Sequence, residues 1–398
     1  MQDELKRGEG KVERSNAVRV SFFGRGSISL LPRELRKRGV KRGLIITDGF
    51  LYKSGAADKV GERLLEAGAE YAIYYLVQPN PTVEIVNECL DAVKTLQVDF
   101  LVAVGGGSAI DTAKAVSIVL ENGGKVEDYE GVNRSERKGV PIVAVNTTAG
   151  TGSEVTAFYI VTDPRRRSKM CMVDPNCMVS IAVNDVDFMM TMPPKLTAAT
   201  GMDAMTHAIE AVLSKKAVPI TDKDALWAIT VINDYLPRAF ENGSDVEARE
   251  MMAYAEYTAG MAFSNAGLGM VHAMAHALGG MMNLPHGVCN AVLLPYVMEF
   301  SGSFSRVSGR FRKVAHALGI SFKEYVKDEE VVYMCTEHIR NLSRRLSLPG
   351  SLKELDIEKP DFEAMADTAM KDACMADNFF MPSKRQVIEV YQRAYECK

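Results

Sequence analysis

The chain has 398 residues, of which 47% are hydrophobic and 25% charged, and its formal net charge is −4. A single hydrophobic core rarely grows to this size, so we expect two domains. The ordinary composition excludes a disordered or fibrous protein, and the slight excess of acid gives no reason to expect a nucleic-acid partner.

The N-terminal segment MQDELKRGEG is highly charged and lacks the apolar stretch of a signal peptide. No run in the sequence approaches the roughly 18 apolar residues that a membrane helix needs. The seven cysteines are scattered without paired spacing, which is typical of reduced thiols. We therefore expect a cytoplasmic protein that binds neither membrane nor nucleic acid.

The first half of the chain alternates strand-like and helical segments. Apolar, strand-like runs occupy residues 18–23, 43–47, 71–77, 99–104 and 141–146, and amphipathic segments occupy 56–67, 82–96 and 109–120. Strands that alternate with helices predict βαβ units and a parallel sheet. Residues 154–184 are less regular and contain further β-rich runs.

The character of the sequence changes after Met192-Pro193-Pro194, because proline suits the first turn of a helix and long helical patterns follow. These patterns cover residues 195–213, 221–240, 248–264, 272–281 and 304–317. We place the domain boundary here. Residues 1–192 are expected to form an α/β dinucleotide-binding domain, and residues 193–398 an all-helical domain that holds metal and substrate.

A glycine turn joins the fourth strand-like run to a helix. Gly105, Gly106, Gly107 and Ser108 place a helix N-terminus where its free N–H groups and positive dipole end can meet a pyrophosphate. Ser108 and Asp111 match a capping box. A purely structural turn with a good cap would show the same pattern, since the usual GxGxxG spacing is absent.

Two further segments support a dinucleotide site. Asp48 ends an apolar run, where dinucleotide-binding folds hold an acid that binds ribose. Its charge would repel the 2′-phosphate of NADP by up to about 4 kcal/mol at 4 Å and an effective dielectric constant of 20, which favours NAD. Asp48 could instead be an ordinary turn residue before Gly49. Residues 146–154, NTTAGTGSE, suit a loop that lines a phosphate or ribose, or a polar loop without a ligand.

Four of the six histidines lie between positions 207 and 286. Asp203 and His207 are four residues apart, so both project from one face of a helix, and His272 and His276 repeat that spacing. His286 stands in a Pro-His-Gly turn just beyond the helix. Three imidazoles and one carboxylate suit Fe(II), Zn(II) or Mn(II), and the absence of a thiolate favours iron. Isolated histidines of apolar helices are usually core residues, but two pairs and a turn are harder to explain that way.

Taken together, these segments resemble the iron-containing (group III) alcohol dehydrogenases over about residues 18–350. The motifs that carry the resemblance are GGGSAIDTAK at 105–114, NTTAGTGSEVT at 146–156, MPPKLTAATGMDAMTHAIE at 192–210, and residues 260–295. The resemblance implies a dehydroquinate synthase-like fold, with an α/β N-terminal dinucleotide-binding domain and an all-α C-terminal domain. It also implies a cofactor and a metal in the cleft between them, and a homodimer formed through the N-terminal strands.

The resemblance also assigns roles to residues. It implies four metal ligands, namely Asp203, His207, His272 and His286. It makes His276 an active-site histidine that does not bind the metal, and that either relays a proton or supports the site. The implied dinucleotide contacts are Asp48, Asn80, Gly105, Gly106, Gly107, Ser108, Asp111, Thr147, Thr148, Thr151 and Lys169.

One segment departs from the family. Cys374–Pro382 stands where the family usually has a Cys-Thr-x-x-Asn-Pro-Arg-like stretch that borders the substrate pocket. The added Phe379, Phe380 and Met381 put the usual substrate assignments in question.

We therefore expect a metal-dependent alcohol dehydrogenase or aldehyde reductase that transfers hydride between NAD(H) and a short-chain alcohol or aldehyde. Fe(II) is the expected metal, with Zn(II) or Mn(II) as alternatives. Other substrates fit the same residues: a polyol such as glycerol with zinc, or a functionalised aldehyde such as lactaldehyde, 3-hydroxypropanal or sulfoacetaldehyde. A lyase of the dehydroquinate synthase type and a regulatory protein without catalysis are the competing classes. NADH that accumulates with alcohol would exclude the lyase.

Overall fold

The structure is a computed structural model that describes residues 15–396. Its N-terminal region is built on a six-stranded sheet in the order β1-β9-β6-β4-β2-β3, with every neighbouring pair parallel. The central strands are almost wholly buried, which explains their unbroken apolar sequence, since a parallel sheet is covered on both faces. The strands are β1 (Ser21–Phe23), β2 (Arg42–Asp48), β3 (Glu70–Val77), β4 (Phe100–Gly105), β6 (Ile142–Asn146) and β9 (Ile181–Asn184).

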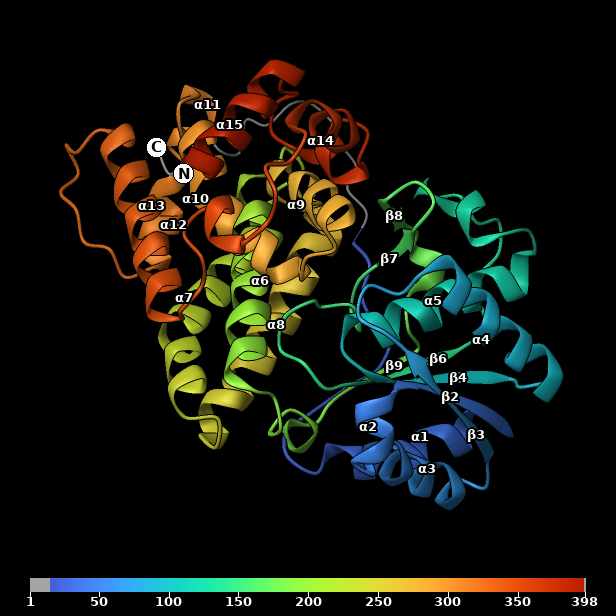
Figure 1. Ribbon diagram of the computed structural model, residues 1–398. Helices are drawn as coiled ribbons and strands as arrows, with labels where there is room; N and C mark the ends of the chain where they lie inside the picture. The colour runs from blue at the N-terminus through green and yellow to red at the C-terminus, as the bar shows by residue number, and fades with distance from the viewer. Residues whose placement is uncertain (1–14, 397–398) are drawn as a thin grey trace.

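Helices cover both faces of this sheet (Figure 1). On one face, apolar side chains of α1 (Leu31–Arg38) and α3 (Ala56–Glu66) join the core, and on the other those of α4 (Val83–Leu96) and α5 (Gly107–Asn122). The short α2 (Gly49–Lys53) follows β2. The parallel α/β arrangement predicted from the alternating pattern is confirmed. The first strand is shorter than predicted, because only residues 21–23 pair with β9.

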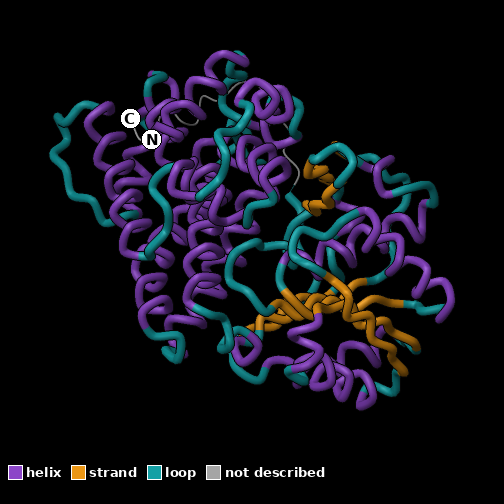
Figure 2. Tube along the Cα trace, viewed as in Figure 1, coloured by secondary structure: helices purple, strands orange, loops and turns teal. Residues whose placement is uncertain are grey.

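A smaller sheet lies beside the main one (Figure 2). It consists of β5 (Gly131–Val132), β8 (Ser168–Val173) and β7 (Phe158–Asp163), with β7 and β8 antiparallel. These last two strands account for much of the β-rich section predicted over residues 154–184. Short 3₁₀ helices complete the described chain: η2 (Ser27–Leu30), η3 (Val126–Tyr129), η4 (Pro175–Cys177), η5 (Val186–Phe188), η6 (Leu352–Leu355) and η7 (Ala373–Asp377).

Residues after β9 form a helical region around one large hydrophobic core (Figure 1). The predicted boundary between residues 192 and 193 falls in the connection between β9 and α6. The helix predicted over residues 304–317 is divided in two, with Ser308 and Gly309, weak helix formers, near the break. The helices are α6 (Pro194–Leu213), α7 (Pro219–Glu241), α8 (Val246–Ala266), α9 (Met270–Met282), α10 (His286–Gly302), α11 (Ser305–Ser308), α12 (Phe311–Ala317), α13 (Asp328–Arg345), α14 (Phe362–Ala369) and α15 (Lys384–Glu396).

Across residues 15–396, every helix is too short or too polar to span a lipid bilayer.

Candidate metal centre and cofactor cleft

The carboxyl ends of β2, β4 and β6 bring three sequence-predicted segments to one edge of the sheet. The chain runs from β2 outward to β3 and then returns to the other side of β2 as β4, so the strand order reverses here. Open α/β sheets bind ligands at such a reversal, beyond the carboxyl ends of the strands. Asp48, Gly105 and Asn146 occupy these three ends.

The glycine turn is tightly enclosed. A Cβ at Gly106 would come within 2.6 Å of the Thr148 side chain, and one at Gly107 within 2.9 Å of Thr151. Contacts this short do not occur at real Cβ atoms. The two predicted loops therefore pack against each other only because the turn has no side chains at these positions.

The predicted capping box of Ser108 and Asp111 is wrong. Helix α5 already begins at Gly107, with Gly106 as its N-cap, and no described side chain caps it. The carboxylate of Asp111 instead accepts hydrogen bonds from the Ser153 hydroxyl and, at 2.9 Å, from the Ile160 backbone. Asp111 thus anchors the Thr/Gly-rich loop and β7 against α5.

Asp48 and the Asn80–Lys169 pair have clear local roles. Oδ1 of Asp48 accepts hydrogen bonds from the N–H groups of Phe50 and Leu51, at 2.8 and 2.9 Å, and so caps α2. The turn interpretation of Asp48 therefore holds, and its contact with ribose stays a prediction. The buried Lys169 donates a 2.8 Å hydrogen bond from Nζ to Oδ1 of Asn80, and burial lowers the pKa of this lysine.

The four predicted metal ligands come together. Asp203 and His207 project from α6, His272 from α9, and His286 is the first residue of α10. One ligand atom from each lies within 4.8 Å of the others. Oδ1 of Asp203 is 3.8 Å from Nε2 of His272 and 3.6 Å from Nε2 of His286. Ligand atoms about 2.0–2.2 Å from a tetrahedral ion would be roughly 3.3–3.6 Å apart, so little movement is needed.

The charges of this cluster suit a cation. Burial lowers the pKa of His207, His272 and His286 well below the ordinary value, so all three rings are neutral and keep a lone pair for a metal. Burial raises the pKa of Asp203 to about 7. The charge of Lys169 offsets this effect only in part, and a divalent ion bound directly to the carboxylate would favour its ionised form further.

Asn290 marks the point where the ligand atoms converge, and sequence reasoning missed it. Its Nδ2 lies 2.6 Å from Oδ1 of Asp203 and 3.1 Å from Nε2 of both His272 and His286. An NH2 group has two hydrogens for these three acceptors. A metal ion at this point would contact all three atoms. Asn290 lies four residues after His286 on α10, so helical spacing could have revealed it.

Glu210 is a second residue that sequence reasoning missed. Its Oε2 is 2.6 Å from Nδ1 of His272, and Oε1 accepts a 2.7 Å hydrogen bond from Val271 N–H. A proton held on Nδ1 leaves Nε2 of His272 free to face the cluster, an arrangement common behind metal-binding histidines. Glu210 follows His207 by three residues on α6, which is a signal that the sequence carried.

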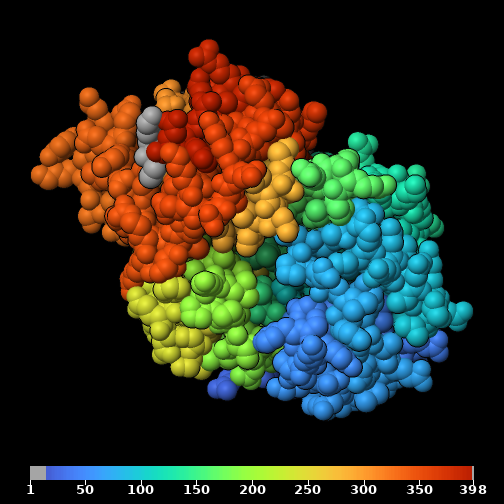
Figure 3. Space-filling model, viewed as in Figure 1, coloured from blue at the N-terminus to red at the C-terminus, as the bar shows by residue number. Residues whose placement is uncertain are grey.

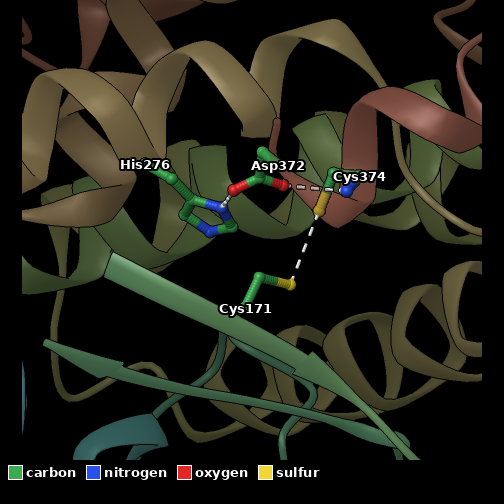
Figure 4. A group of neighbouring side chains, drawn as sticks. All are labelled: Cys171, His276, Asp372 and Cys374. Atoms are coloured by element: carbon green, nitrogen blue, oxygen red, sulfur yellow. Dashed lines mark hydrogen bonds and ion pairs between the residues drawn. The ribbon is translucent and has the colours of Figure 1, made fainter. Parts of the chain in front are cut away.

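His276 faces a different partner. Its Nδ1 lies 2.8 Å from Oδ2 of Asp372, and its ring stacks on that of His286 with centroids 5.1 Å apart. Burial opposes ionisation of Asp372, but the charge and hydrogen bond of His276 hold the pKa of this carboxyl below its ordinary value. Figure 4 shows that Cys171 and Cys374 lie close to this pair. Asp372 follows His276 by 96 residues, too far for any local pattern to link them.

One cleft, of about 720 Å³, joins the glycine turn to the histidine cluster. Its apolar lining is Phe158, Ile160, Phe263 and Leu268. In Figure 3 the surface is hollowed where the blue N-terminal region meets the green and yellow helical region. From the predicted sites, the cleft is lined by Asn80, Gly107, Ser108, Asp111, Thr151, Lys169, Asp203, His207, His272, His276 and His286. The lining does not include Asp48, Gly105, Gly106, Thr147 or Thr148.

The unusual C-terminal segment lies away from this lining. Phe380 packs against Phe304 with ring centroids 4.0 Å apart, and Phe379 and Phe380 line a separate surface pocket with Arg306. The aromatic side chains that the sequence adds here are therefore not part of the described wall of the cleft.

Comparison with known proteins identifies the family of this chain. Residues 19–186 match the family described as iron-containing alcohol dehydrogenase, and residues 197–395 match the C-terminal part of the Fe-containing alcohol dehydrogenase family. The chain is 44% identical to alcohol dehydrogenase 4 of Schizosaccharomyces pombe (94% of this chain, 87% of the relative) and 40% identical to NAD-dependent methanol dehydrogenase of Bacillus methanolicus (94% and 98%). A crystal structure of 1,3-propanediol oxidoreductase superimposes with a TM-score of 0.92 at 39% identity, covering 97% of this chain and 100% of that one. The chain belongs to the iron-containing alcohol dehydrogenase family and is a metal-dependent alcohol dehydrogenase.

Proposed function

We propose that this enzyme transfers hydride between NAD(H) and a short-chain alcohol or aldehyde at a metal held by Asp203, His207, His272 and His286. One observation carries the proposal: a single cleft is lined both by the glycine turn and by the four converging ligands. Iron is the proposed metal, because the ligand set contains a carboxylate and imidazoles but no thiolate.

The dinucleotide would lie along the edge where β2, β4 and β6 end. Gly106, Gly107 and Ser108 would present the N–H groups of α5 to its pyrophosphate. Thr147, Thr148 and Thr151 would line the facing side of the same turn, since Thr148 and Thr151 are in contact with it. Gly105 allows the turn to form, and Asp111 anchors the facing loop through Ser153. Asp48 would bind the ribose at the end of β2, and Asn80 and Lys169 would contact the dinucleotide from the cleft wall.

When bound, the metal would act as a Lewis acid toward the substrate oxygen, and the dinucleotide would donate or accept the hydride. The residues of the chain do the rest. The ionised Asp372 accepts the Nδ1 proton of His276, so that Nε2 is free to exchange a proton with the substrate oxygen, directly or through one water. Phe158, Phe263 and Leu268 limit the access of bulk water to the reacting atoms.

Two further observations support a proposal for the cellular setting and the assembly. All six cysteines within residues 15–396 are unpaired, which supports a reducing cytoplasm. Strand β1 lies at an edge of the main sheet, and an open strand edge can pair with a second copy of the chain. We propose a cytoplasmic homodimer.

The function is tested by anaerobic purification, loading with ferrous iron, metal analysis and NADH oxidation against a panel of aldehydes. The panel contains acetaldehyde, butyraldehyde, lactaldehyde, 3-hydroxypropanal and sulfoacetaldehyde. We expect about one iron per chain and NADH consumption with at least one aldehyde. Iron-loaded protein that oxidises no NADH with any of them would contradict the proposal, and a preference for polyols over one-hydroxyl alcohols would shift it to a glycerol-type substrate.

A further inference from the structure

We propose that Cys171, Cys374, Asp372 and His276 form a second metal site, for zinc or another divalent cation that prefers sulfur. Cys171 lies on β8, His276 on α9, and Asp372 and Cys374 at the start of η7, so the site joins the small sheet to the helical region (Figure 4). It shares no residue with the first centre. Its existence is independent of the proposed function, whereas its effect on turnover rests on that function.

The spacing of the two sulfur atoms fits a shared cation. Sγ of Cys171 and Sγ of Cys374 are 3.9 Å apart, and one ligand atom from each of the four residues lies within 4.8 Å of the others. Zinc–sulfur bonds of about 2.3 Å in a tetrahedron separate two sulfur atoms by about 3.8 Å. Nδ1 of His276 and Oδ2 of Asp372, now 2.8 Å apart in a hydrogen bond, would need to separate by about 0.5 Å.

The two thiols are not joined by a disulfide. Bonded sulfur atoms lie about 2.05 Å apart, so the two thiols would have to approach by about 1.9 Å. A cation needs a far smaller displacement of the sulfur atoms.

The donor set has the chemistry of a zinc site. Two thiols, an imidazole and a carboxylate are the ligand types that zinc takes in four-coordinate sites. Binding would release the two thiol protons to solvent, and the Nδ1 proton of His276 would move to Nε2. No oxidant or reductant is involved. Two thiolates and one carboxylate around a divalent ion would leave one negative charge.

A route to the site exists that does not pass through the substrate cleft. Cys171 and Asp372 also line a separate outer cleft, whose wall includes Arg134, Arg166 and Lys371. Arg166 is already paired with Glu130 and Asp163, so Arg134 and Lys371 are the cations that can offset the negative charge of the loaded site. A plausible metal site needs an entry path as well as ligands, and the outer cleft supplies one.

Occupation of this site would disable His276. With Nδ1 bound to the cation, the remaining ring proton sits on Nε2, and that nitrogen no longer has a lone pair to accept a proton. A metal at the second site would therefore inhibit turnover without displacing the metal of the first centre.

The test uses Co²⁺ added under anaerobic conditions to the iron-loaded enzyme. A thiolate bound to cobalt gives a charge-transfer band in the near ultraviolet, and the four ligands of the first centre include no cysteine. We expect this band to saturate at about one cobalt per chain. Its absence from the wild-type protein would overturn the proposal.

Cysteine variants identify the thiols that give rise to the cobalt band. The double variant Cys171→Ser/Cys374→Ser should lose it, whereas Cys289→Ala, which removes another fully buried thiol, should keep it. The single variant Cys171→Ala gives a second test if the double variant does not fold, and it should weaken the band. A band of undiminished intensity in Cys171→Ala would place the cobalt elsewhere and contradict the site.

Turnover separates this proposal from the proposed function. Excess Zn²⁺ should lower kcat of the wild-type enzyme by about 100-fold, the usual share of a proton relay, while the iron content stays constant. The double variant should keep its activity under the same conditions. A cobalt band without zinc inhibition would support the site and contradict the relay role of His276.

Discussion

Two clusters of side chains with the chemistry of metal ligands lie next to each other in this enzyme, and they are built in different ways. The first takes Asp203, His207, His272 and His286 from α6, α9 and the start of α10. The second combines β8, α9 and η7, which are far apart in the chain. His276 and His286 stack where the two clusters meet.

The clusters also differ in how their polar groups are satisfied. In the first, Oδ1 of Asp203 and Nε2 of both His272 and His286 converge on the single amide nitrogen of Asn290, and a divalent cation would bind all three atoms. In the second, Asp372 accepts hydrogen bonds from His276 and from the Cys374 N–H, and the thiols stay protonated. We infer that the first centre must hold a metal for function, whereas the second can exist without one.

The largest expected effect is the loss of a ligand from the first centre. His272→Ala should reduce the metal content to near zero and lower kcat/KM by about 1,000-fold, because the Lewis acid contributes several kcal/mol to catalysis. Metal analysis and NADH oxidation measure both effects. His316→Ala, on the exposed side of α12, is the matched control and should change neither. A His272→Ala enzyme that keeps its metal would show that His272 is not a required ligand and contradict the proposed first centre.

The next largest effects are expected from the two carboxylates that hydrogen-bond to histidines, Glu210 and Asp372. Glu210→Gln should weaken metal binding by about 10–100-fold, because Glu210 orients the ligand His272. Asp372→Asn should leave metal affinity unchanged and lower kcat by a similar factor, because Asp372 orients His276. Metal titration and steady-state kinetics of both variants distinguish the roles. Loss of metal in Asp372→Asn would show that His276 belongs to the first centre.

The difference in construction explains what the sequence could predict. Asp203 with His207, and His272 with His276, follow helical spacing, and helical spacing alone places such pairs on one face. Alternation of apolar strands with amphipathic helices was enough for the parallel sheet and the all-helical second half. Local patterns therefore predicted the fold class and grouped the candidate ligands, whereas the exclusion of His276 from the ligand set came from the resemblance to the family.

The second cluster and the cap of α5 could not be predicted in this way. Cys171, His276 and Cys374 meet only through the packing of β8, α9 and η7, and no spacing in the sequence reports that contact. Asp111 matched a capping box, but a tertiary hydrogen bond from Ile160 and one from Ser153 hold its side chain elsewhere. Tertiary partners outweighed a local preference worth about 1 kcal/mol.

A third group of buried acidic side chains, Glu154 and Glu256, lies outside both clusters. Burial, and then the charge of Glu154, raise the pKa of Glu256 well above its ordinary value of 4.5. The unfolded chain releases this proton at lower pH than the folded one. The free energy of unfolding should therefore fall as the pH rises from about 4.5 through the folded pKa, by about 1.4 kcal/mol per unit of difference.

Glu256→Gln should remove most of this pH dependence and raise Tm in mildly alkaline buffer. The amide oxygen can still accept the hydrogen bond from Gly152 N–H that Glu256 accepts at 2.7 Å. Thermal unfolding of both proteins between pH 5 and 9 is the measurement. An equally steep loss of stability in Glu256→Gln would show that other groups cause it.

The smallest expected effect concerns Asp48, a predicted cofactor residue that also caps α2. Asp48→Asn removes the charge but keeps an oxygen that can cap α2, so the cap of about 1 kcal/mol is retained. If Asp48 faces the ribose, loss of the carboxylate should raise kcat/KM for NADPH relative to NADH by about five-fold, which corresponds to about 1 kcal/mol. Asp99→Asn, whose side chain caps backbone N–H groups of Lys41 and Arg42 near the opposite ends of the strands, is the control and should leave the ratio unchanged. An unchanged ratio in Asp48→Asn would reduce Asp48 to a helix cap and leave the choice of cofactor to the packed loops around Gly106.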